Sequence, residues 1–75
     1  MNDIDWAGTV KGMLKAEIKR RNLTYDMLSE RLAEYGVRET PQNLRTKISR
    51  GGFSAVFFIQ CLKAIGCQTL RLEES

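Results

Sequence analysis

The sequence predicts an all-α domain of four to five helices that takes up the whole chain, residues 1–75. Two observations support this prediction. Apolar residues recur at intervals of three and four, and residues typical of helix starts and ends divide the chain into helix-sized segments. These segments cover about residues 4–21, 24–35, 41–50 and 55–65, and a tail follows at 67–75. At 75 residues and 8.6 kDa, the chain has room for a single domain.

The first segment, residues 4–21, places its larger apolar side chains within one helical stripe. That stripe consists of Trp6, Val10, Met13, Leu14 and Ile18. Glu17 falls inside it, either held by a neighbouring side chain or at the rim of the contact, and we favour the rim. Lys11, Lys15 and Lys19 are four residues apart and form a basic ridge on one flank.

The boundaries of the other three segments follow from capping residues. A hydroxyl side chain at the N-cap accepts a hydrogen bond from the first turn of a helix, and glycine after the last turn adopts a left-handed conformation. The predicted N-caps are Thr24, Thr40 and Ser54, and the predicted closing glycines are Gly36, Gly51 and Gly66. Pro41 suits the first helical position, where its missing N–H is not needed.

The third segment, residues 41–50, has a wide polar face. Only Leu44 and Ile48 are strongly apolar, and they lie about 40° apart on a helical wheel. The polar face opposite them spans about 140° to 260° and has Arg45 and Lys47 on its flanks. It is made of Gln42, Asn43, Thr46, Ser49 and Arg50. No acidic residue lies between Thr40 and Arg50.

The fourth segment, residues 55–65, is apolar nearly all round, with only Gln60 and Lys63 polar. Such a helix must be covered on most sides, and three short helices leave room for a second protomer as a lid. Residues 67–72 alternate weakly and suit a short strand or an extended arm, which a two-fold mate would pair. The predicted dimer interface consists of Phe57, Phe58, Leu70 and Leu72.

The basic charge of the chain is concentrated in its middle. The net charge is +3 and the pI is about 9.1. Residues 11–50 carry ten basic and five acidic side chains, so the excess there is +5. A basic centre is typical of proteins that contact a phosphate backbone, although a solvated surface explains such an imbalance equally well.

Several other classes of function are excluded by residue content. Without histidine and with only two cysteines, Cys61 and Cys67, the chain lacks the four ligands of a structural zinc site, and we expect no metal or cofactor. Cys61 lies in an apolar run and is expected to be buried. No acid pair, nucleophile elbow or phosphate-binding glycine loop indicates an enzyme. No stretch approaches 18 apolar residues, and acids stand where a signal peptide has Lys or Arg, so we expect a cytoplasmic protein without a membrane segment.

The order of elements resembles the lambda-repressor-like helix-turn-helix class over residues 10–65. The resemblance rests on LTYDMLSERLAEYGVRETPQNLRTKISRGGFSAVFFIQCLKAIG, and its matching parts are Leu23-Thr24, Gly36-Val37, Thr40 and Gly51. It implies that Gln42, Asn43 and Thr46 face base edges. It also implies that Thr40, Lys47 and Arg50 lie near phosphates. Arg45 sits at the edge of this face, where the resemblance allows it a phosphate contact or a base contact. The chain is similar as well to a small bacterial domain family without an assigned function.

The sequence therefore predicts a dimeric transcriptional regulator that binds double-stranded DNA with residues 41–50 in the major groove. The alternative is a helical protein–protein interaction module that uses the apolar helix 55–65 and binds no DNA.

Overall fold

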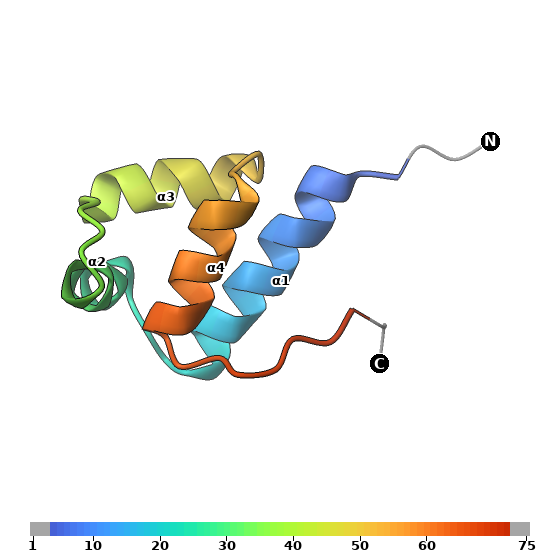
Figure 1. The fold of residues 1–75 in the computed structure, drawn as a ribbon. Helices are drawn as coiled ribbons and strands as arrows, with labels where there is room; N and C mark the ends of the chain where they lie inside the picture. Colours follow the sequence, from blue (N-terminus) through green and yellow to red (C-terminus); the bar gives the residue numbers. More distant parts are fainter. Residues whose placement is uncertain (1–3, 73–75) are drawn as a thin grey trace.

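The computed structural model describes residues 4–72 and contains four helices and no strand within them. The helices are α1 (Trp6–Arg20), α2 (Tyr25–Glu34), α3 (Pro41–Arg50) and α4 (Ala55–Ala64). The all-α class is thus confirmed. The predicted C-terminal strand does not form in residues 67–72, which follow α4 as an extended arm (Figure 1). Residues 73–75 of the predicted tail and residues 1–3 lie outside the described part of the chain.

The capping residues predicted from the sequence are confirmed. Each N-cap hydroxyl accepts the backbone N–H three residues further on, at 3.1 Å for Thr24, 3.0 Å for Thr40 and 3.1 Å for Ser54. The three closing glycines have φ values of 77° to 81°. They are Gly36, Gly51 and Gly66. Local chemistry therefore accounts for where α2, α3 and α4 begin, and it contributes to where they end.

The four helices share one small core. Both α1 and α2 pack against α3 and α4. Figure 1 shows α1 and α4 side by side, with α3 across one end of them and the extended arm at the opposite end. The fully buried large side chains are Leu14, Leu28, Leu32, Leu44, Ile48 and Cys61. Because α3 lies at one end of the bundle, its outer surface faces away from the other helices.

The start of α1 fixes the end of α3 through a close backbone approach. Gly51 is buried, and a Cβ atom on it would lie 2.5 Å from the carbonyl oxygen of Ala7. The ammonium of Lys11 donates to the backbone carbonyl of Ser49 at 3.1 Å. Lys11 thus satisfies a carbonyl in the last turn of α3, where such groups lack helical partners.

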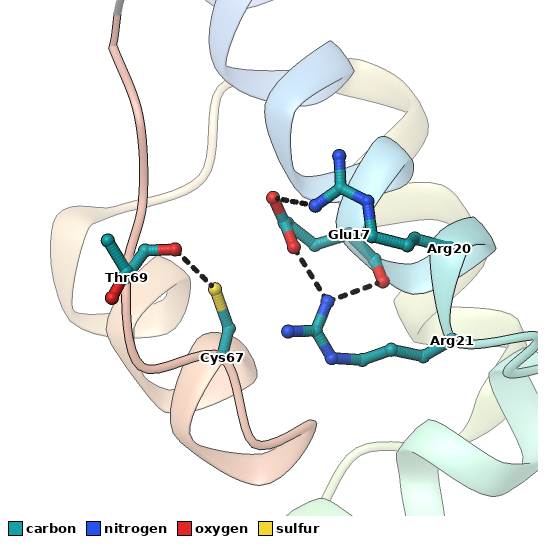
Figure 2. Close-up of polar contacts among 5 residues, drawn as sticks. All are labelled: Glu17, Arg20, Arg21, Cys67 and Thr69. Carbon is teal, nitrogen blue, oxygen red and sulfur yellow. Dashed lines mark hydrogen bonds and ion pairs between the residues drawn. The ribbon is translucent and has the colours of Figure 1, made fainter.

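Glu17 is buried, so its expected position at the rim was wrong. Figure 2 shows its carboxylate between two guanidinium groups, with Arg21 at 2.6 Å and Arg20 at 2.8 Å. Arg21 also donates to the backbone carbonyl of Glu17 at 3.0 Å. The hydrogen bond from Arg21, with that from Arg20, holds the pKa of Glu17 below its usual value despite burial. The carboxylate tolerates its buried site because both oxygens are paired.

The apolar stripe of α1 is buried only in its second half. Leu14 and Ile18 belong to the core, whereas Trp6 is 66% exposed. The core therefore takes up the apolar side chains of the second half of α1 and leaves the indole largely exposed. None of the four described helices is long and apolar enough to cross a membrane.

Both cysteines are buried and unpaired, and the expected burial of Cys61 is confirmed. Burial, together with the nearby carboxylate of Glu39, raises the pKa of the Cys61 thiol to about 12. Cys67 donates its S–H to the carbonyl of Thr69 at 3.3 Å at the start of the arm (Figure 2).

Candidate nucleic-acid interface

Helix α3 is attached to the fold by one narrow stripe. Leu44 and Ile48 are fully buried, and Pro41 is partly buried. Every other residue of the helix is exposed, and none of them is acidic. The exposed residues are Gln42, Asn43, Arg45, Thr46, Lys47, Ser49 and Arg50. All the residues of α3 that the sequence predicted to face nucleotides therefore lie on the surface of the monomer.

The two threonines of this surface make hydrogen bonds within the helix. Thr40 Oγ1 accepts from the backbone N–H of Asn43 at 3.0 Å and caps α3. Thr46 Oγ1 donates to the carbonyl of Gln42 at 3.1 Å. The hydroxyl proton of Thr40 is not used in the cap, so it stays available to an acceptor. The side-chain amides of Gln42 and Asn43 form no hydrogen bond with any of the described residues.

The three cations of α3 have different surroundings. Lys47 is paired with Glu39 at 2.5 Å, and its ammonium also lies 5.1 Å from the centre of the Phe57 ring. The guanidinium of Arg45 lies over the ring of Tyr25, at 5.0 Å from its centre. Arg50 forms no ion pair within residues 4–72. Lys47 is thus partly neutralised, whereas Arg45 and Arg50 keep their full charge for a partner.

Sequence reasoning missed the partners of Arg45 and Lys47. Tyr25 is the first residue of α2, and Glu39 lies in the connection between α2 and α3. The hydroxyl of Ser29 donates to the carbonyl of Glu39 at 2.6 Å and fixes that connection against α2. A helical wheel of residues 41–50 contains none of these groups, so no signal within that segment indicated them.

The predicted dimer residues occupy different environments. Phe57 is buried in the monomer, with its ring centre 5.5 Å from that of Phe53. Phe58 and Leu70 are half-buried against the core, and Leu72 is 82% exposed.

The exposed apolar side chains of α4 are instead Val56, at 67%, and Ile59, at 55%. These two side chains lie one helical turn apart. Together they form an apolar strip that the monomer leaves open, and the sequence analysis did not place Val56 in an interface.

A comparison with protein families finds one match, to a domain of unknown function (DUF6471), over residues 6–70. The chain belongs to the DUF6471 family. The match runs from the first residue of α1 into the extended arm, so the whole four-helix unit is the DUF6471 domain. It confirms the predicted resemblance to a small domain family without an assigned function. No curated protein and no solved structure matches the chain.

Proposed function

We propose that this DUF6471 domain binds double-stranded DNA, with α3 in the major groove. The observation that carries the proposal is the exposed polar face of α3, which contains no acid and which the core does not use. A major groove accepts one α-helix, and its base edges are read by side chains that both donate and accept. The position of α3 supports the same role. The helix crosses one end of the bundle, so its outer face is turned away from the other helices (Figure 1).

Base reading falls to Gln42, Asn43 and Thr46. The two amides occupy the first turn of α3, and Thr46 lies one turn after Gln42. An amide can bond both N6 and N7 of adenine, and a threonine methyl suits the methyl group of thymine. These three residues are adjacent on the helical surface, so they would contact neighbouring base pairs.

Phosphate contacts fall to Thr40 at the start of the helix and to Arg45 and Arg50 further along. The first turn of α3 also presents backbone N–H groups, which favour an anion. Lys47 can join this set only by leaving Glu39. The order of α2, α3 and the apolar α4 resembles lambda-repressor-like regulators, which supports a helix-turn-helix mode of binding.

The apolar strip of Val56 and Ile59 supports a homodimer as the acting species. A second copy packed on this strip would cover these two side chains. In a dimer that reads one operator, the two α3 helices would lie about 34 Å apart, the spacing of successive major grooves. Such a dimer would act as a sequence-specific transcriptional regulator.

The test is fluorescence anisotropy on a pool of random DNA duplexes, followed by selection of a preferred sequence. Arg50→Ala should weaken binding to all sequences alike, whereas Gln42→Ala should relax preference at one base pair by about 1–3 kcal/mol. Lys63→Ala is the matched control, because it removes the same charge from an exposed position in the last turn of α4, at the end away from α3. Absence of binding at micromolar protein in low salt would rule out the proposal.

The same apolar strip also supports the second candidate, a protein–protein interaction module that binds no DNA. Light scattering of the wild type and of an Ile59→Ser variant separates the two. A self-associating protein that Ile59→Ser makes monomeric, with DNA binding weakened in parallel, favours the regulator. A protein that associates without any affinity for DNA favours the interaction module.

A further inference from the structure

A basic surface next to α3 adds two lysines and a tyrosine to Arg45 of the site described above. It is centred on Tyr25, the first residue of α2, whose ring carries the guanidinium of Arg45. Tyr25 also lines a shallow hollow of about 220 Å³ together with Lys15 and Lys19 of α1. The apolar floor of this hollow is formed by Ile18 and Leu23. One tyrosine thus joins three cations from two helices that are far apart in the sequence.

We infer that Lys15, Lys19, Tyr25 and Arg45, the Tyr25 patch, bind the DNA backbone beside the groove that α3 enters. This inference rests on the proposed function and names the residues that would hold the flanking phosphates. Within it, Tyr25 is a positioning residue, because it acts through Arg45.

The charged ends of the two lysines of the patch are not used within the described part of the fold. Lys15 and Lys19 are exposed and form no ion pair within the described chain. They lie four residues apart on one helix, where like charges repel and destabilise. Lys11, the third lysine of the same ridge, differs because it bonds the carbonyl of Ser49. A polyanion beside Lys15 and Lys19 would relieve their repulsion and release its own counterions.

The ring of Tyr25 prepares Arg45 for such a contact. A guanidinium over an aromatic face interacts through its flat surface, which leaves the N–H donors at its edge for phosphate. Among the described residues, no oxygen accepts a hydrogen bond from Arg45. Holding the side chain in place before binding reduces the rotamer freedom that is lost in the complex.

The contrast with Lys47 points in the same direction. Glu39 and the Phe57 ring hold Lys47 against the protein, and its charge is compensated by a carboxylate. Arg45 is held by a neutral ring, so its charge is not compensated. Of these two neighbouring cations, Arg45 is the one prepared for a phosphate.

The experiment measures DNA affinity against salt for the wild type and for a Lys15→Gln/Lys19→Gln variant. Loss of two phosphate contacts should make the log–log salt slope shallower by about 1.8 and weaken binding roughly tenfold or more at low salt. The matched control is Lys63→Gln/Arg71→Gln, which removes two exposed cations from α4 and the arm. That control should leave the slope unchanged. If both double variants change the slope equally, the patch is not a binding site.

The role of Tyr25 is tested by a double-mutant cycle that combines substitutions of Tyr25 with Arg45→Ala. Tyr25→Leu should weaken binding about three- to tenfold, Tyr25→Phe should restore it, and Tyr25→Leu should have no effect once Arg45 is Ala. Thermal unfolding of each variant separates this effect from lost packing, since Tyr25 also contacts the core. An equal loss in the Arg45→Ala background would show that Tyr25 acts through packing alone.

A carboxylate at the edge of the patch gives a test of opposite sign. Asp26 follows Tyr25 and is exposed in the first turn of α2. Asp26→Asn should tighten binding about two- to fivefold, because it removes repulsion from the same phosphates. Unchanged or weaker binding would count against the patch. If the wild type does not bind DNA at all, the proposed function fails first, and this outcome differs from binding that is indifferent to the patch.

Discussion

Gly51→Ala tests whether the close approach of α1 to the end of α3 holds the fold together. Gly51 has a φ of 77°, and a Cβ on it would lie 2.5 Å from the carbonyl oxygen of Ala7 and 3.2 Å from Cβ of Lys11. Gly36 provides the matched control. It has a φ of 78°, but a Cβ there would meet no atom within 4 Å. The two substitutions thus share the backbone conformation and differ in the space around the new methyl group.

The left-handed conformation costs an alanine about 1–2 kcal/mol at either position. At Gly51 the new carbon must also move away from the Ala7 oxygen, since carbon–oxygen contacts lie at about 3.3 Å or more. Because that oxygen belongs to a helix backbone, the shift of several tenths of an ångström must be taken up by α1 or α3. Overpacking of this kind costs about 1–3 kcal/mol. We therefore expect the free energy of unfolding to fall by about 1–3 kcal/mol more in Gly51→Ala than in Gly36→Ala.

Urea unfolding followed by far-UV circular dichroism measures both losses. Trp6 is a poor fluorescence probe because it is largely exposed in the folded state. A domain of this length has about 4–11 kcal/mol of stability in total. Gly51→Ala should still fold, with a Tm roughly 5–20 °C below that of Gly36→Ala. Equal losses within about 0.5 kcal/mol would refute the reasoning, since the contact with Ala7 would then not constrain the fold.

Three further predictions concern single side chains. The hydrogen bond from Arg21 lowers the pKa of Glu17 in the folded state below its unfolded-state pKa of about 4.5. The charged Glu17 therefore stabilises the fold at pH values above about 4.5, and this contribution is lost as the pH falls through the lowered pKa. Wild type should therefore lose more stability than Glu17→Gln between about pH 5 and pH 2 in acid titrations of urea unfolding. In a Cys67→Ser variant, the buried Cys61 thiol should react with a thiol reagent only as fast as the domain opens, and rapid labelling without denaturant would contradict its burial. Thr40→Ala should lower the free energy of unfolding by about 1 kcal/mol whereas Thr40→Ser should not, and equal stability of the two would show that the cap contributes nothing.

Element boundaries were predictable because they depend on neighbours in sequence. The hydroxyl of Thr40 reaches an N–H three residues away, and Gly51 supplies a local backbone conformation. The exposure of Gln42 and Thr46 follows from the same local logic, since two buried residues on α3 leave the opposite side open. Helix α3 and its outer face were therefore largely specified by residues 40–51.

Features that depend on contacts between segments were not predictable in this way. Glu17 is buried because Arg21, in the turn after α1, folds back onto its carboxylate. Trp6 is largely exposed even though it begins a helix that packs against α3 and α4. Helical spacing assigns both residues to the apolar stripe, but it does not show where the neighbouring helices end. The pairing of Arg45 with Tyr25 was not predicted for the same reason, because it joins two different helices.

The surface of α4 shows what amino-acid composition can and cannot predict about exposed side chains. Its apolar residues indicated a helix covered on most sides, and the structure buries Phe57, Cys61 and Leu62. Val56 and Ile59 remain outside because no element within residues 4–72 covers them. Composition thus revealed the excess of apolar surface, whereas only the packed structure shows which side chains make it up.

In helix α3, the residues that stabilise the fold are different from those that we propose bind DNA, so the two roles can be tested separately. Its attachment depends on Leu44 and Ile48, and truncation of either should cost several kcal/mol, as expected for fully buried aliphatic residues. Gln42 and Arg50 are exposed, so substituting them should change stability by about 0.5 kcal/mol or less. A loss of DNA binding in those variants is therefore not explained by unfolding. If their stability falls as much as that of Leu44→Ala, the polar face belongs to the fold and the case for a DNA-reading helix is lost.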